Sequence, residues 1–117
     1  MKKANLENGE WQKGEGYYKR VFFDPIDMKQ DGVQLQQIKI SPNQIAENHY
    51  HENQTEVFYF LNNHGYFVVN GEKVIIKTGD ILMIEPRDEH KVVNNSDRDF
   101  LYLAFKSNYT NDDIYWV

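Results

Sequence analysis

The stretch H-Y-H-E-N-Q-T-E-V-F-Y-F-L, residues 49–61, joins a polar segment to an apolar one. Its second half holds aromatic and aliphatic residues of the kind that favour a β-strand. Its first half carries His49 and His51, which leave the same face of an extended chain because they are two residues apart. Glu56 follows His49 by seven positions, so an unbroken strand would point it to the opposite face. The polar residues 52–55 favour a turn, and we expect Glu56 to open the next strand facing back toward the histidines.

Short strand signals separated by turn residues continue on both sides of this stretch. Asn70-Gly71 predicts a type I′ hairpin turn, and we interpret the break in alternation at Gln36-Gln37 as a β-bulge. One short helical turn is expected within residues 25–30. Further strands are expected over residues 17–23, 33–40, 66–69, 72–77, 81–84, 91–93 and 100–106. Many short strands with few residues between them are typical of an all-β sandwich or small barrel.

A chain of 117 residues is near the commonest size of one domain. We expect a single domain with a polar arm over residues 1–16, a core over 33–106 and a tail over 108–117. The bulky side chains of the arm, Trp11, Tyr17 and Tyr18, predict that it packs either across its own sheet or on the edge of a partner subunit. The tail ends in I-Y-W-V, which we expect to be buried. From the arm and the open sheet edge we predict a homodimer.

Composition excludes several classes of function. With 13 basic and 18 acidic residues the net charge is −5, and no run of lysine or arginine predicts binding to nucleic acid or to an anionic membrane. The absence of cysteine excludes thiolate metal sites, disulfides and a cysteine nucleophile. No apolar run approaches the roughly 20 residues of a membrane helix, and no signal sequence is evident. We therefore expect a cytoplasmic protein that acts on a small molecule.

A third histidine joins the first two after a turn late in the chain. His90 follows Gly79-Asp80, a short strand and the residues E-P-R-D-E. A histidine pair alone is more often a surface feature or a hydrogen-bonded core feature, but Glu56 and His90 complete a set of three imidazoles and one carboxylate. Such a set suits one divalent first-row metal: Mn, Fe, Co, Ni, Cu or Zn. We interpret the metal ligands as His49, His51, Glu56 and His90.

These two segments resemble the paired motifs of the cupin superfamily. The first is the H-x-H-x-x-x-x-E pattern that runs into an apolar strand. The second runs from Gly79-Asp80 through a proline-bearing turn to His90 and Asn94. The resemblance covers residues 33–106 and implies a double-stranded β-helix, or jelly-roll, barrel with the metal inside, held by the same four side chains. The chain departs from the pattern where Asn63 and Arg87 replace glycines and where proline stands one place late.

The open coordination positions lead to the functional hypotheses. Four protein ligands on a metal that accepts six leave two adjacent positions, which is typical of a catalytic site. Our leading hypothesis is a mononuclear-metal enzyme that isomerises or opens the ring of a small sugar or sugar acid, with the metal as Lewis acid. The alternatives are a dioxygenase, a non-catalytic sugar or metabolite binder, and a metal-free epimerase that uses one histidine as base. No catalytic residue is singled out.

We expect the substrate pocket to be lined by six side chains. For His64 and Arg87 the competing interpretation is an exposed turn or loop residue. The six are Phe58, Phe60, His64, Phe67, Arg87 and Tyr102.

Overall fold

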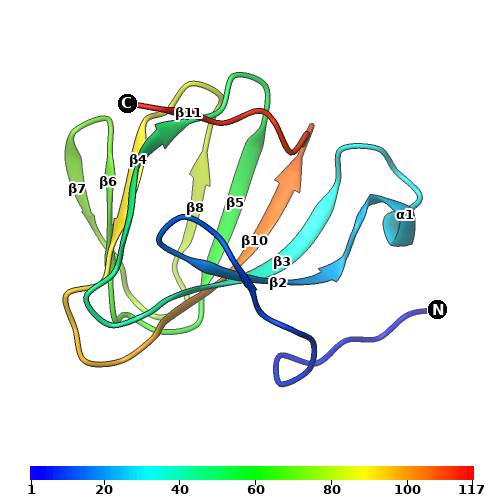
Figure 1. The fold of residues 1–117 in the computed structure, drawn as a ribbon, viewed down its shortest axis with the longest axis horizontal. Helices are drawn as coiled ribbons and strands as arrows, with labels where there is room; N and C mark the ends of the chain where they lie inside the picture. The colour runs from blue at the N-terminus through cyan, green and yellow to red at the C-terminus, as the bar shows by residue number, and fades with distance from the viewer.

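Two antiparallel sheets face each other in the computed structural model, which describes all of residues 1–117 (Figure 1). The six-stranded sheet has the order β1 (Gln12–Lys13), β2 (Tyr18–Phe23), β3 (Gln34–Ile40), β10 (Phe100–Ser107), β5 (Thr55–Phe60), β8 (Ile81–Ile84). The five-stranded sheet has the order β11 (Tyr115–Trp116), β4 (Ile45–Tyr50), β9 (His90–Val93), β6 (Tyr66–Val69), β7 (Glu72–Ile75). The expected all-β jelly-roll architecture is confirmed, although the two sheets do not close into one continuous barrel.

Local turn chemistry explains two of the connections. Asn70 and Gly71 have φ angles of 50° and 80°, as a type I′ turn requires, and they join β6 to β7 at the pair Val69 and Glu72. The short helix α1 (Pro25–Met28) begins at Asp24, whose side chain accepts the N–H of Asp27. Both the hairpin and the single helical turn were predicted from the sequence, and both are confirmed.

The expected β-bulge at Gln36-Gln37 is wrong. Strand β3 alternates without a break, and its inward positions are all buried: Gln34, Gln36, Ile38 and Ile40. The register shift lies in the neighbouring strand β2, between Val21 and Phe23. The alternation looks broken in the sequence because the inward residues change from glutamine to isoleucine along the strand, and Gln36 lines a cavity.

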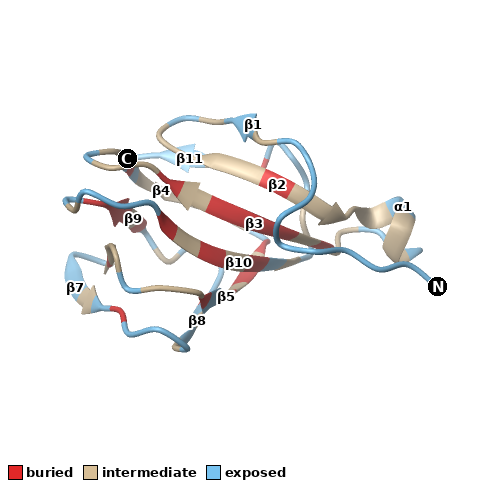
Figure 2. Cartoon of the chain, turned by 90° about the horizontal axis from the view of Figure 1, so that it is seen from below, coloured by how far each residue is buried: buried red, intermediate tan, exposed pale blue.

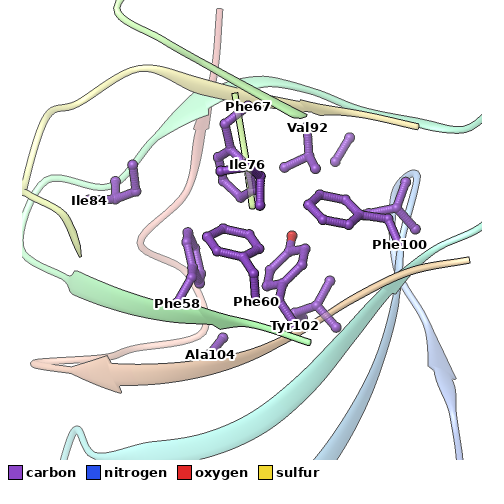
Figure 3. Packing of buried hydrophobic residues seen from close by; sticks show 12 residues of the cluster. Phe58, Phe60, Phe67, Ile76, Ile84, Val92, Phe100, Tyr102 and Ala104 are labelled. Carbon is purple, nitrogen blue, oxygen red and sulfur yellow. The ribbon is translucent and has the colours of Figure 1, made fainter. Parts of the chain in front are cut away.

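Aromatic side chains fill the space between the sheets (Figure 3). Phe60 packs in parallel against Phe100, with ring centroids 5.6 Å apart, and meets Tyr102 at 5.2 Å. Phe67 reaches this cluster from the opposite sheet, 5.5 Å from Phe60. Burying one such ring contributes about 2 to 3 kcal/mol. Figure 2 shows the buried residues concentrated on β3, β10 and β5, the centre of the larger sheet.

The N-terminal arm packs across its own sheet. Strand β1 pairs with β2 through Gln12 and Lys19. The Trp11 ring lies 4.2 Å from the guanidinium carbon of Arg20 and 4.5 Å from the amine of Lys39. The first of the two expected roles for the arm is therefore the one observed. The homodimer remains a prediction.

The C-terminal tail is held by strand pairing rather than by burial. In β11, Tyr115 pairs with Tyr50 and Trp116 with His49, which places the tail along β4 (Figure 1). Tyr115, Trp116 and Val117 nevertheless keep 39%, 48% and 63% of their surface exposed. The expectation that the end of the chain is buried is wrong, because β11 is an edge strand with nothing on its outer side. The single short helix cannot span a membrane.

Candidate metal centre

Three histidines converge between the two sheets at the end where the tail crosses. One nitrogen from each ring lies within 4.8 Å of the other two, close enough for the three to hold one metal ion. His49 and His90 are direct partners across β4 and β9, with ring centroids 4.2 Å apart. The register of these two strands shifts between Ala46 and His49. This irregularity turns His49 to the same inner side as the buried Ala46, although the two residues are an odd number apart.

Glu56 lies beside the histidines, as the polar turn before it predicts. Its carboxylate is buried, and Oε1 is 2.9 Å from Nε2 of His51 and 3.7 Å from Nε2 of His90. Residues 51–54 lie between the end of β4 and the start of β5, where the chain reverses. The structure therefore brings together the four residues that we interpreted as ligands.

Backbone carbonyls set the orientation of all three rings. Nδ1 of His49 lies 2.7 Å from the carbonyl oxygen of Glu47. Nδ1 of His51 lies 2.5 Å from the carbonyl oxygen of Asp113, and Nδ1 of His90 lies 2.9 Å from that of Asp88. A carbonyl oxygen only accepts, so each Nδ1 carries the proton and donates it. Each Nε2 then presents its lone pair to the shared space, which is the arrangement of a metal-ligating histidine.

One buried atom tests whether a metal fits here. Nε2 of His51 has no hydrogen-bond partner, because its 2.9 Å approach to Glu56 is out of hydrogen-bond geometry. In the neutral ring with Nδ1 protonated, this lone pair faces a carboxylate oxygen, and two acceptors buried together repel each other. In the metal-free protein burial would lower the pKa of His51, but Glu56 outweighs it, raises that pKa and favours a second proton on the ring. A cation shared by both atoms relieves that repulsion. Three nitrogens and one carboxylate form a donor set that first-row divalent metals accept, so the residues present fit such an ion.

The protonation states of His49 and Glu56 favour ligation near neutral pH. Burial, together with the neighbouring His90, lowers the pKa of His49 from 6.5 to about 4. The imidazole of His49 is therefore neutral near pH 7. Burial would raise the pKa of Glu56, but the adjacent imidazoles of His51 and His90 outweigh it and hold that pKa well below its usual value. Glu56 is therefore ionised, and its negative charge suits a cation.

A cavity of about 80 Å³ opens beside these residues. Phe58, Phe67 and Trp116 form its aromatic wall, while Gln36 and Lys106 add polar groups. Lys106 is the cross-strand partner of Glu56, and burial lowers the pKa of its amine despite the nearby carboxylate. Burial raises the pKa of the Tyr102 hydroxyl well above its usual value, so this hydroxyl keeps its proton.

Half of the residues expected in the substrate pocket line this cavity. Phe58, Phe67 and Tyr102 do so, and the other three lie elsewhere. Phe60 is fully buried one inward position further along β5, against Phe100. His64 contacts the carbonyl of Asp99, 3.1 Å away, on a different part of the surface. Arg87 is exposed in the turn before His90 with a φ of 74°, so the side chain of Arg87 does not line the cavity.

Sequence reasoning missed four residues that the structure places at or around the site. Gln36 and Lys106 had a usable signal, because each lies an even number of residues from buried neighbours on its own strand. Asp113 and Trp116 had none, because they lie in the tail and meet the histidines only after the chain has folded.

Comparisons with known proteins agree with this geometry. The family model for the cupin domain matches residues 36–106. The oxalate-binding protein of Thermotoga maritima is 33% identical over 67 residues, which are 57% of this chain and 55% of that protein. The chain thus spans about half the length of this curated relative.

Solved structures show the same architecture. A predicted oxalate decarboxylase from Thermotoga maritima has a TM-score of 0.70 at 25% identity, covering 78% of this chain and 79% of that one. The polyketide cyclase RemF of Streptomyces resistomycificus has a TM-score of 0.85 at 19% identity, covering 100% of this chain and 85% of that one. At that identity the second likeness concerns the fold alone.

Proposed function

This chain belongs to the cupin family, and we propose that it is a mononuclear-metal enzyme that isomerises or opens the ring of a small sugar or sugar acid. The observation that carries this proposal is the convergence of three Nε2 lone pairs and one carboxylate on a cavity that also holds a lysine amine. We propose that His49, His51, Glu56 and His90 hold one divalent first-row metal. When bound, the metal supplies a Lewis acid that polarises a carbonyl or hydroxyl oxygen of the ligand.

Lys106 is the group we propose for proton transfer. Lys106 lines the cavity together with the histidines, and the lowered pKa of its amine makes the neutral form more accessible near pH 7. As a base, the amine takes a proton from the hydroxyl-bearing carbon beside the substrate carbonyl. It then returns a proton to the former carbonyl carbon. The proton of the hydroxyl group on the first carbon passes to the former carbonyl oxygen, so the isomerisation consumes no oxidant or reductant. Tyr102 lines the cavity where it borders the aromatic core, and we propose that its protonated hydroxyl donates a hydrogen bond to a substrate oxygen.

The size of the cavity limits what enters it. Drug-sized ligands occupy pockets of roughly 300 to 1,000 Å³, whereas this cavity holds about 80 Å³. We therefore propose that only a compact acid, or the reacting end of a sugar acid, lies inside. The aromatic wall of Phe58, Phe67 and Trp116 would cover its carbon face and keep water away from the amine.

A second candidate is the binding of a small dicarboxylate without turnover. The curated relative from Thermotoga maritima bears the name oxalate-binding protein and is 33% identical over the matched region. A dicarboxylate with adjacent carboxyl groups is small and presents two oxygens side by side, which suits both the cavity and a metal with two open positions.

Loading the purified protein with each of Mn, Fe, Co, Ni, Cu and Zn tests both candidates. Elemental analysis and thermal unfolding report metal binding, and proton NMR of sugars and sugar acids in D₂O reports isomerisation through solvent exchange at carbon. We expect the wild-type protein to exchange a carbon-bound hydrogen of the substrate with solvent. We expect His90→Ala and Lys106→Met to lose this exchange. Oxalate that raises the Tm without any turnover would favour the binding role, and oxygen uptake would favour a dioxygenase. A wild-type protein that takes up none of the six metals would contradict both candidates.

We also propose that the protein is a homodimer. Strand β8 is the open edge of the larger sheet, and Ile81 and Met83 on it keep 71% and 56% of their surface exposed. An antiparallel edge that pairs with its own copy forms a two-fold symmetric contact. Size-exclusion chromatography with light scattering should give twice the mass of 13.9 kDa. Ile81→Lys should return the protein to a monomer, and a wild-type monomer would refute the proposal.

A further inference from the structure

The C-terminal tail lies outside the part of the chain that the cupin model matches. That match ends at residue 106, whereas Asp113 to Val117 lie directly beside the histidines. Figure 1 shows the tail crossing the open end of the fold along β4, from the larger sheet to the smaller one. Family membership alone does not account for this segment, so its contacts must show what it contributes.

The side chain of Asp113 holds the turn that separates two of the proposed ligands. Its carboxylate accepts three backbone hydrogen bonds, from Glu52 at 2.8 Å and from Asn53 and Gln54 at 3.0 Å each. The turn that these bonds hold is the one that lets His51 and Glu56 face the same space.

The backbone of the same residue orients His51. The Asp113 carbonyl accepts the Nδ1 proton of His51 at 2.5 Å. His49 and His90 are oriented differently, because each uses the carbonyl of the residue two positions earlier in the sequence. His51 is therefore the one histidine of the three whose ring orientation depends on a segment about 60 residues away in sequence.

Trp116 covers the opposite side of the site. Its ring lies 5.1 Å from the ring of His49 and forms part of the cavity wall. Two anchors keep it there, namely the pairing of Tyr115 with Tyr50 and the hydrogen bond from the Val117 N–H to the Asn48 carbonyl at 3.1 Å. Without Trp116, the cavity would open to solvent next to His49.

We propose that the tail Asp113–Val117 is part of the metal centre, with Asp113 as a positioning residue for His51 and Glu56, and Trp116 as the cover over His49. This inference rests on the proposed metal site and adds the residues that orient and cover its ligands. Partners that orient metal-ligating histidines typically change metal affinity by about 10- to 100-fold when removed. The tail of this chain then acts through the ligands and touches no metal itself.

Asp113→Ala in the full-length protein tests the positioning role. We expect Zn²⁺ or Co²⁺ affinity, measured by competition with a chromophoric chelator, to fall by about 10- to 100-fold. The matched control is Asp112→Ala, which removes the neighbouring exposed carboxylate and should leave affinity unchanged. Alanine keeps the Asp113 carbonyl but removes the three side-chain bonds that hold it beside His51. In the metal-free protein at alkaline pH, where the rings are neutral, nitrogen-15 NMR should therefore show that His51 loses its preference for the Nδ1–H form in Asp113→Ala while His49 and His90 keep theirs. A merely structural role for Asp113 would not produce this selective change.

Trp116→Ala leaves Asp113 in place and keeps the inference testable if Asp113→Ala does not fold. We expect a chelator to strip metal from Trp116→Ala several times faster than from wild type, with little change in the His51 tautomer. Wild-type affinity in Asp113→Ala together with an unchanged His51 ring would overturn the positioning role. If Trp116→Ala lost metal to the chelator at the wild-type rate, the proposed role of Trp116 as a cover over His49 would be overturned. A wild-type protein that binds no metal would instead overturn the proposed function, and the NMR comparison would still decide whether Asp113 orients His51.

Discussion

The two ends of the space between the sheets are built from the same strands and differ completely in chemistry. Along β5 the inward side chain changes from Glu56 at one end to Phe60 at the other, and along β3 from Gln36 to Ile40. Cross-strand pairing keeps the two ends apart, because Lys106 on β10 faces Glu56, whereas Tyr102 faces Phe60. We call these the polar end and the apolar end.

This contrast explains how a small fold can support a buried polar site. Burying hydrogen-bonding and charged groups costs free energy when their partners are incomplete, as for the unpartnered Nε2 of His51. The stacked rings of the apolar end supply favourable burial instead (Figure 3). Substitutions at the apolar end should therefore cost stability and spare the chemistry, and substitutions at the polar end should do the reverse.

Phe60→Ala should give the largest effect, because it removes a fully buried ring from the apolar end. We expect the free energy of unfolding to fall by about 3 to 5 kcal/mol in urea titrations. The metal affinity of the molecules that remain folded should stay as in wild type. Tyr59→Ala on the outer face of the same strand is the control and should cost less than about 1 kcal/mol. Equal losses in the two variants would contradict the assignment of the apolar end as the source of stability.

His90→Ala, at the polar end, should have the opposite effect to Phe60→Ala, because it removes metal binding and not core packing. At a metal concentration 100 times the dissociation constant, the wild-type protein should gain about 2.7 kcal/mol of stability, seen as a higher Tm that a chelator reverses. His90→Ala should lose this gain because one ligand is missing. His64→Ala removes the histidine that lies away from the site and should keep it. The metal centre would be refuted if both variants responded to metal like wild type.

The pH dependence of the metal-free protein should report the titration of the half-buried His49. Its pKa falls from 6.5 in an exposed chain to about 4 in the folded protein, so between these values the unfolded state binds a proton that the folded state does not. Stability should therefore drop as the pH falls from 6.5 toward 4, by on the order of 1 to 3 kcal/mol.

His51 opposes this trend. Burial would lower its pKa, but Glu56 outweighs burial and raises it, so the contribution of His51 to stability is present at low pH and lost as the pH rises. Urea midpoints at several pH values for wild type and His49→Gln isolate the His49 part. The variant should lose less stability on acidification, and an identical loss would show that His49 is not the group responsible.

Arg87→Gly should give the smallest effect and should stabilise the protein. Arg87 has a φ of 74°, a left-handed conformation that a side chain disfavours and glycine accepts freely. We expect a gain of about 0.5 to 1 kcal/mol, measured by urea unfolding. Arg87→Ala removes the same charge but keeps the Cβ, so it should bring no gain. A gain of equal size in both variants would point to charge rather than to backbone strain.

Much of the fold could be predicted because its signals are local. The Asn70-Gly71 turn, the short helix after Asp24 and the strands on either side of each turn are encoded within a few neighbouring residues. The error at Gln36-Gln37 has the same origin. The prediction assumes that apolar residues face inward and polar residues outward, but Gln34 and Gln36 of β3 face inward, and Gln36 lines a cavity. Residue type alone does not say what the inner face will meet.

The candidate site divides in the same way. The spacing of His49, His51 and Glu56 around a polar turn, and the later His90, already indicated which side chains should meet, because turn chemistry and strand alternation act over short distances. The tertiary structure alone decided that Asp113 holds that turn, that Trp116 covers His49 and that Lys106 shares the cavity. The contacts of Asp113 and Trp116 join segments about 60 residues apart. The position of Lys106 depends on which end of β10 lies at the site. Only the packing of the two sheets brings such segments together, so no short stretch of sequence contains them.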